Sequence, residues 1–323
     1  MRSRRMLLNA IGLAMLAGFA ACGGGGGGND PGPVTGATID ISTTNRDSVA
    51  HAAVTGVWGL TLGTMAPLAT GSSGSGRSMS VWLQSQRERV AGAVQRERVM
   101  AVIGPIVEPC LVSGSRTATW NDADNNGVLL SVGDVLTGVF DNCQDVAGET
   151  TNGTMIITVP SATTLRMAMD QLSFDTTRHA IRLTGSVRLE DVSADTVQTT
   201  TEGLVTIALT LKHLAPAFTD TVTLQEGFVT RETRGNGETV STFDGLLDST
   251  AARGVVRLTT VTNAPIRQFD AYDYPYTGML QVKGKNSMLQ MTVLSADQVQ
   301  LGLDADNNGS FESTSTVTWD WLL

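Results

Sequence analysis

The sequence has few of the residues and none of the short motifs that mark common enzyme families. Aromatic residues make up 5% of the chain, and its three histidines, His51, His179 and His213, share no metal-binding spacing. His-Glu-x-x-His, Gly-x-Ser-x-Gly and glycine-rich phosphate loops are all missing. These absences exclude the usual signatures of zinc proteases, α/β-hydrolases and nucleotide-binding enzymes. We therefore expect a protein that is not an enzyme.

Long apolar runs are also scarce. The apolar run Met6–Phe19, interrupted only by Asn9, follows three arginines and precedes two alanines and Cys22. It is too short for a permanent membrane helix, and its flanks are typical of a signal peptide. We expect residues 1–21 to be removed and Cys22 to become the lipid-bearing N-terminus. The alternative is a simple secreted protein in which this cysteine is incidental.

The segment Phe19-Ala-Ala-Cys22 resembles the lipobox of bacterial lipoproteins, with Phe19 in place of the usual leucine. This resemblance implies acyl chains on Cys22, and several chains together give firm membrane anchoring. Because Gly23 rather than aspartate follows the cysteine, the resemblance also implies the outer membrane. The segment Ser3–Leu8 is similar to a twin-arginine export motif as well, so the export route stays open.

Positive charge is scarce in the mature chain. Residues 1–21 hold three of the 22 basic residues and none of the 31 acidic ones, which leaves 19 against 31 and a net charge near −12. Such a chain repels nucleic acid and anionic headgroups, so we expect no nucleic-acid partner. Residues 22–36 contain six consecutive glycines, a composition that predicts a disordered tether.

Cysteine is limited to two residues beyond Cys22. Cys110 and Cys143 are expected to form a disulfide, because cysteines pair in the oxidising cell envelope. The alternative is a pair of reactive thiols, but no Cys-x-x-Cys motif supports redox chemistry.

Local patterns predict a β-rich α+β fold. Alternation predicts a short strand at 38–42, and capping and periodicity predict helices at 45–55 and 79–103, the second stopped by Gly104-Pro105. Threonine- and valine-rich segments at short intervals then predict an antiparallel meander sheet or partial barrel, covered by the two N-terminal helices. We expect residues 37–109 and the β domain 110–323 to form one folded unit. Trp319 and Trp321 would end the last strand, as core anchors or as a ligand platform.

The sequence Asp-Ala-Asp-Asn-Asn-Gly occurs twice, at 122–127 and at 304–309. Side-chain oxygens at positions 1, 3 and 5 with glycine at position 6 match the first half of a calcium loop. The second halves depart from that pattern, because position 12 is not an acid in either copy. The alternative is a turn in which the Asp and Asn side chains satisfy their own backbone. The candidate calcium ligands are Asp122, Asp124, Asn126, Asp134, Asp304, Asp306, Asn308 and Glu312.

Together, the lipobox, the glycine tether, the 110–143 segment with its acidic turn and the threonine-rich strands resemble a group of uncharacterised proteobacterial lipoproteins. The resemblance implies an envelope location and a fold but no activity. One interpretation is a non-catalytic module, structural or binding an envelope protein. The other is a carrier whose curved sheet encloses a lipid.

Overall fold

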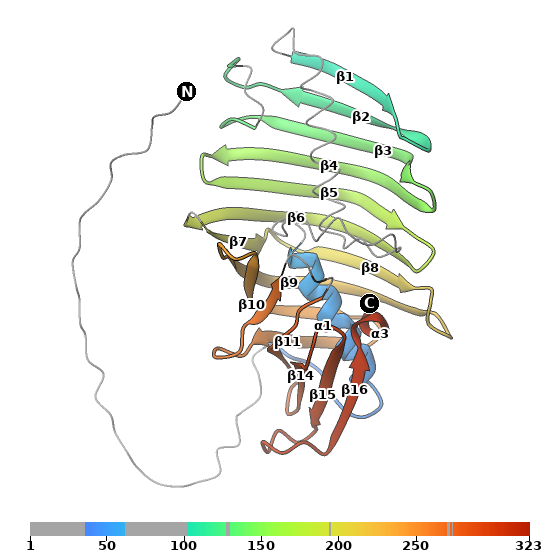
Figure 1. The fold of residues 1–323 in the computed structure, drawn as a ribbon, viewed down its shortest axis with the longest axis vertical. Coiled ribbons are helices and arrows are strands. Elements are labelled where there is room, and N and C mark those ends of the chain that lie inside the picture. Colours follow the sequence, from blue (N-terminus) through green and yellow to red (C-terminus); the bar gives the residue numbers. More distant parts are fainter. Residues whose placement is uncertain (1–35, 62–101, 127–129, 194, 270–271, 273) are drawn as a thin grey trace, which may run out of the picture. The chain divides into compact units, whose positions relative to one another are not determined.

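The computed structural model describes residues 36–61, 102–126, 130–193, 195–269, 272 and 274–323. Over these residues the chain is mostly antiparallel β-sheet with two helices, which confirms the predicted fold class and the meander (Figure 1). The helices are α1 (Arg46–Thr61) and α3 (Trp319–Leu322). The strands are β1 (Val102–Pro109), β2 (Ser113–Asn121), β3 (Val135–Val146), β4 (Glu149–Ser161), β5 (Thr164–Asp175), β6 (His179–Ser193), β7 (Thr196–Thr201), β8 (Val205–Leu211), β9 (Phe218–Thr233), β10 (Glu238–Ser249), β11 (Gly254–Thr260), β12 (Ile266–Phe269), β13 (Gly278–Lys283), β14 (Met288–Val293), β15 (Gln298–Asp304) and β16 (Ser313–Thr318).

The strands follow each other across one sheet from β1 to β16, with two local branches. Both β7 and β8 lie between β6 and β9, because the first half of β6 pairs with β8 and the second half with β7. Gly185 stands at this fork with φ near +130°, and a Cβ there would lie 2.5 Å from the carbonyl oxygen of Leu204. Only glycine fits such a close backbone approach. At the second branch, β12 pairs with the start of β10.

One face of the sheet is apolar across β2 to β5. Directly paired residues of neighbouring antiparallel strands point to the same face, and the pairs Trp120–Leu136, Leu136–Ile157 and Ile157–Met167 run across β2 to β5. All four side chains are buried, whereas the opposite face carries partly exposed residues such as Thr158. The strands therefore alternate between an apolar and a polar face, as predicted.

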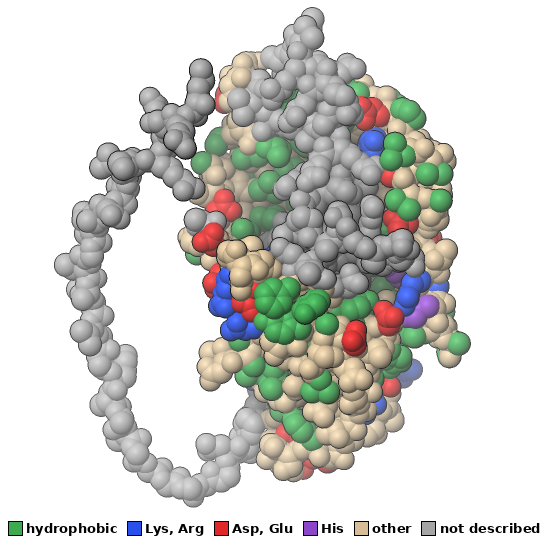
Figure 2. Space-filling view, in the orientation of Figure 1, with side chains coloured by type: hydrophobic (Ala, Val, Ile, Leu, Met, Phe, Trp, Pro, Cys, Tyr) green, Lys and Arg blue, Asp and Glu red, His purple; other side chains and the backbone are tan. Residues whose placement is uncertain are grey.

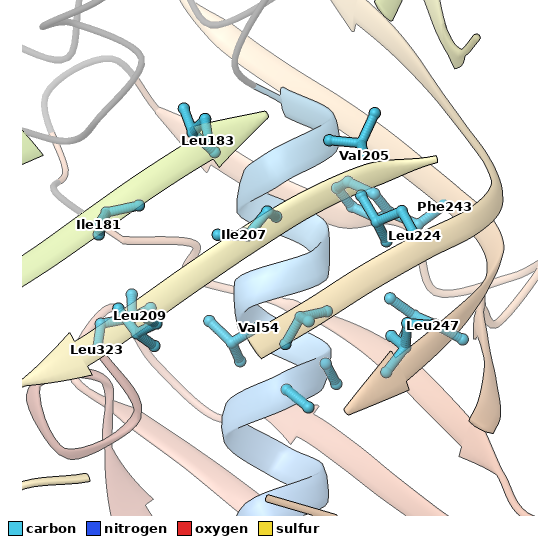
Figure 3. Close-up of a cluster of buried hydrophobic side chains, with 14 of the residues drawn as sticks. Val54, Ile181, Leu183, Val205, Ile207, Leu209, Leu224, Phe243, Leu247 and Leu323 are labelled. Carbon is cyan, nitrogen blue, oxygen red and sulfur yellow. The ribbon is translucent and has the colours of Figure 1, made fainter. Parts of the chain in front are cut away.

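Helix α1 packs on this apolar face over β7 to β10. Figure 3 shows Val54 of α1 among Leu209, Leu224 and Leu247, and all four side chains are buried. At the helix start, Asn45 Oδ1 accepts the backbone amide of Ser42 at 2.8 Å. This helix confirms the first of the two predicted N-terminal helices, and neither described helix is long and apolar enough to cross a membrane.

The predicted end of this helix at residue 55, before Gly56, was wrong, because α1 continues to Thr61. A Cβ at Gly56 would lie 3.2 Å from Leu247 Cδ2 and 3.3 Å from Leu224 Cδ2. The glycine therefore lets the helix approach β9 and β10 closely, and tertiary packing outweighs its tendency to end a helix.

Three other local predictions concern the segments 38–42, 79–103 and 104–105. Residues 38–42 are not a strand; Thr38 N donates to Val255 O at 3.0 Å and Ile39 O accepts from Lys285 N at 2.7 Å, so the segment bridges β11 and the turn after β13. The predicted second helix, 79–103, lies outside the described residues except for its last two, which belong to β1. Gly104-Pro105 also lies in β1, at the point where the register with β2 shifts. Proline is tolerated there because β1 is an edge strand.

The chain ends in helix α3 rather than in a strand. The hydroxyl of Thr318 caps it by accepting Trp321 N at 3.2 Å. Trp319 is buried and stacks on Tyr274 at 5.8 Å, and Trp321 contacts the ring of His51 at 4.5 Å. These contacts favour the interpretation of both tryptophans as anchors of the fold.

Candidate functional site

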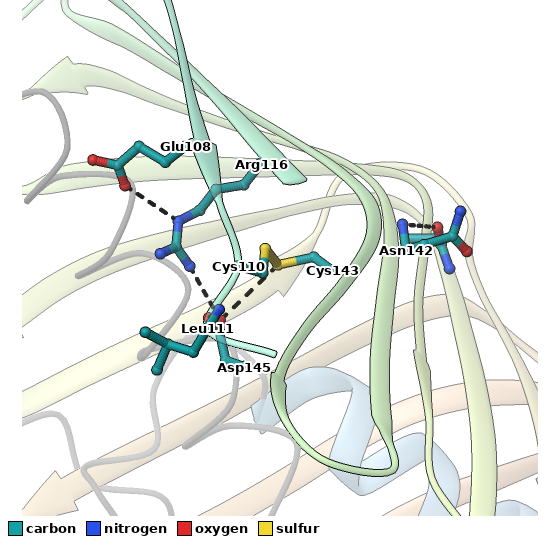
Figure 4. The surroundings of a disulfide bond; sticks show 8 residues. Glu108, Cys110, Leu111, Arg116, Asn142, Cys143 and Asp145 are labelled. Carbon is teal, nitrogen blue, oxygen red and sulfur yellow. Dashed lines mark hydrogen bonds and ion pairs between the residues drawn. A yellow bond between two sulfur atoms is a disulfide. The ribbon is translucent and has the colours of Figure 1, made fainter. Parts of the chain in front are cut away.

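The predicted disulfide is confirmed: Cys110 and Cys143 are bonded, with Cα atoms 5.5 Å apart, and join the end of β1 to β3 (Figure 4). Beside it, the Arg116 guanidinium lies 3.5 Å from Glu108 and 3.1 Å from Asp145. Asp145 also accepts the backbone amide of Leu111 at 3.1 Å. Both sulfurs are in the disulfide, so they cannot bind a metal as thiolates together with Asp145. The disulfide and the ion pairs of Arg116 instead hold β1, β2 and β3 together at this end of the sheet.

The first acidic turn lies in the hairpin loop between β2 and β3. Carboxylate oxygens of Asp122, Asp124 and Asp134 lie within 4.8 Å of one another. The backbone amide of Asn126 donates to both Asp122 and Asp124 at 3.2 Å, and its side-chain amide donates to Asp124 at 2.6 Å. Asn125 has φ near +56°, in the left-handed region. The structure therefore brings together the predicted residues of this turn.

The second acidic turn, between β15 and β16, repeats this geometry. Oxygens of Asp304, Asp306 and Glu312 lie within 4.8 Å of one another. The backbone amide of Asn308 donates to Asp304 at 3.0 Å and to Asp306 at 3.3 Å, and Asn307 has φ near +57°. The first five residues of the repeat thus have the same hydrogen-bond pattern at both places.

In both turns the third carboxylate comes from outside the repeated sequence and has the same role. Asp134 Oδ1 accepts the amide of Ala123 at 3.1 Å, and Glu312 Oε2 accepts the amide of Ala305 at 2.6 Å. Both alanines stand at position 2 of their turn. Asp134 and Glu312 are therefore structural equivalents, although one follows its turn at position 13 and the other at position 9.

The two turns differ in burial. Asp122 and Asp134 are 3% and 0% exposed in the first turn, whereas only Asp304 is buried in the second. Burial disfavours the charged form of Asp124, but hydrogen bonds from the backbone of Asn126 and from neighbouring side chains outweigh it and lower the pKa of that carboxyl. Each set of three carboxylates could contribute to a calcium ion, which takes six to eight oxygens in proteins. The same hydrogen bonds also complete a turn without any ion.

No sequence pattern predicted a second feature of the structure, a cluster of three aromatic side chains. Phe269, Tyr272 and Tyr276, called here the tyrosine cluster, lie at the end of β12 and just before β13. The rings of Phe269 and Tyr276 stack with centroids 5.0 Å apart, and Tyr272 meets them edge-on at 6.0 and 6.2 Å. Tyr272 is 45% exposed. The chain has three tyrosines, all between 272 and 276, and this concentration was the signal that could have revealed the cluster.

A buried carboxylate, that of Glu238, contacts the tyrosine cluster. The buried Glu238 carboxylate accepts the Tyr276 hydroxyl at 2.5 Å, Arg234 at 2.8 Å and Arg267 at 3.2 Å. The Tyr276 hydroxyl and the two guanidiniums hold the pKa of Glu238 below its usual value, although burial opposes the shift. The same hydrogen bond raises the pKa of Tyr276. Figure 2 shows a hydrophobic patch beside blue and red side chains near the position of β10 in Figure 1.

Comparison with known proteins gave no match to a protein-family model, to a curated protein or to a solved structure. The predicted lipidation site, Cys22, lies outside the described residues.

Proposed function

We propose that this chain is a lipid-anchored protein of the bacterial cell envelope that acts by binding a partner and not by catalysis. The lipobox-like segment ending at Cys22 supports the anchor, and the glycine-rich residues 22–36 would hold the folded part away from the membrane. By the same resemblance, the anchor is in the outer membrane.

The packing under α1 favours a binding module over a lipid carrier. A carrier needs an apolar space between sheet and helix, but Val54, Leu209 and Leu247 are buried there within one hydrophobic cluster (Figure 3). Outward-facing residues such as Thr206 and Thr223 give the opposite face a polar character. Helix α1 therefore packs directly on β7 to β10, which supports the binding module in this part of the fold.

Native mass spectrometry of residues 31–323, the compact unit that holds all described residues, separates the two interpretations. We expect the bare mass of the oxidised chain. Additional mass in the lipid range that is lost on denaturation would support the carrier. The anchor is tested separately with the full chain, in which Cys22→Ser should abolish radiolabelled palmitate incorporation and release the protein from membranes.

As part of the same proposal, we infer that calcium stabilises the acidic turns. The supporting observation is that both turns place three carboxylates together in the same geometry. With dissociation constants of roughly 10⁻⁴–10⁻³ M, millimolar calcium would add about 0.5–1.5 kcal/mol to the unfolding free energy. We expect a melting temperature about 2–4 °C higher in calcium than in chelator.

The matched variants are Asp122→Asn with Asp304→Asn, which should remove this difference, and Asp195→Asn, which should keep it because Asp195 is exposed and distant in sequence from both turns. Equal melting temperatures of the unaltered chain in calcium and in chelator would leave the turns as purely structural features.

A further inference from the structure

Hydrogen bonds connect the described residues of the tyrosine cluster to the strands beside it. The backbone on either side of it is paired, with Tyr276 N donating to Arg267 O at 3.0 Å and Arg267 N donating to Thr277 O at 2.9 Å. The Gln268 side chain donates to Tyr272 O at 2.9 Å. These bonds and the contacts between the three rings are made without a ligand, so a ligand need not form them.

The charged residues beside the tyrosine cluster, called here its rim, are Arg234, Arg267, Glu232 and Glu238. Their positive and negative charges balance. Arg234 contacts Glu232 at 3.1 Å and Glu238 at 2.8 Å, and Arg267 contacts Glu238. Two guanidiniums thus face two carboxylates, and the side chains of Arg234, Arg267 and Glu232 are 37%, 34% and 47% exposed. A phosphate or another anion would have to displace these carboxylates, so the rim suits a neutral ligand with many hydroxyl groups.

We infer that the tyrosine cluster and its rim form a binding site for a neutral oligosaccharide. A pyranose ring has an apolar C–H face that can lie on Tyr272 and its neighbours, and hydroxyls at its edge that can bond to the Arg234 and Glu232 groups. Aromatic rings with a few oriented polar groups are the usual composition of small-ligand sites. The inference rests on the proposed function, since an envelope protein meets glycans.

The test uses the full lipidated chain in a detergent without a sugar headgroup. Chitohexaose, cellohexaose and maltohexaose are the probes, and isothermal titration calorimetry measures binding up to millimolar concentration. We expect at least one probe to bind with a dissociation constant below about 1 mM. Tyr272→Ala should weaken this binding at least about tenfold, which equals 1.4 kcal/mol, and Tyr272→Phe should retain most of it because the ring remains.

Two further variants locate the effect. Arg234→Gln should weaken binding several-fold, because it removes one of the two guanidiniums of the rim while Tyr272 stays exposed. Phe311→Ala changes another exposed aromatic, 41% exposed in the loop before β16, and should leave binding unchanged. Circular dichroism of each variant confirms that it is folded.

The inference is wrong if none of the three probes binds, or if Tyr272→Ala binds as well as the unaltered chain. Loss of cross-linking to an envelope protein in Tyr272→Ala, without sugar binding, would instead define a protein interface. These failures are distinguishable from failure of the proposed function, because palmitate incorporation and the native mass do not depend on Tyr272.

Discussion

Replacing Asp134 by alanine measures how far the first acidic turn depends on its third carboxylate. Asp134 is 0% exposed and accepts three hydrogen bonds, from Trp120 Nε1 at 3.1 Å, Ala123 N at 3.1 Å and Ser131 N at 2.9 Å. The alanine variant removes both carboxylate oxygens and so breaks all three hydrogen bonds at once. It leaves the indole N–H of Trp120 in a buried position, because that side chain is 1% exposed.

The expected loss in unfolding free energy depends on whether each donor can bond to water after the substitution. A stranded buried donor costs about 1–3 kcal/mol, whereas an amide at the loop surface can bond to water and loses about 1 kcal/mol or less. The indole N–H of Trp120 belongs to the first class, and the amides of Ala123 and Ser131 belong to the second. We therefore expect Asp134→Ala to lower the unfolding free energy by about 3 kcal/mol.

Glu312→Ala is the matched control, because Glu312 plays the equivalent role in the second turn. It is exposed and accepts one backbone amide, that of Ala305, so we expect a loss of about 1 kcal/mol or less. Urea unfolding followed by tryptophan fluorescence, in chelator, gives both values. If Asp134→Ala is no more destabilising than Glu312→Ala, the burial argument for the first turn is refuted.

Three further predictions concern stability. Replacing both Cys110 and Cys143 by alanine should lower the unfolding free energy by about 3–4 kcal/mol, since the disulfide closes a loop with a separation of 33 residues; an unchanged urea midpoint would contradict this. Leu247→Ala, at 0% exposure under α1, should cost about 3 kcal/mol by calorimetry, and a loss below 1 kcal/mol would mean that the helix does not pack there. Burial lowers the pKa of His51, and burial with Arg178 nearby lowers that of His179 to about 4. At acidic pH the unfolded chain, in which the histidine pKa is about 6.5, therefore binds more protons than the folded chain. The unfolding free energy is thus highest above pH 6.5 and falls towards pH 4, with about 2 kcal/mol lost at pH 5 through His179 alone. Equal urea midpoints at pH 7 and pH 5 would contradict the assignment of both histidines as neutral in the folded chain.

Features that depend on short stretches of sequence were predictable. The alternation along β4 and β5 indicated strands with one buried face, as at Met167 and Met169, because a period of two residues is a local property. The disulfide was predictable because only Cys110 and Cys143 remained to pair. The repeated acidic turns were visible because neighbouring residues satisfy each other's hydrogen bonds.

Features set by contacts between distant residues were not predictable. Gly56 looks like a helix end until the structure shows it packed closely against Leu224 and Leu247, where a Cβ would make tight contacts. The tyrosine cluster is held by Glu238, which precedes Tyr276 by 38 residues, and no local pattern links a lone glutamate to a tyrosine so far along the chain.

The third carboxylate of the acidic turns shows the limit most clearly. Counting from a calcium-loop pattern places the last acid at position 12, and neither turn has one there. In the structure, the requirement is an acceptor for the amide at position 2, and loops of different length supply it from Asp134 or from Glu312. The backbone amide at position 2 determines what the acid does, and the length of the hairpin loop determines where the acid stands in the sequence. The two acids can therefore be recognised as equivalent only in the folded structure, where the strands on either side are paired.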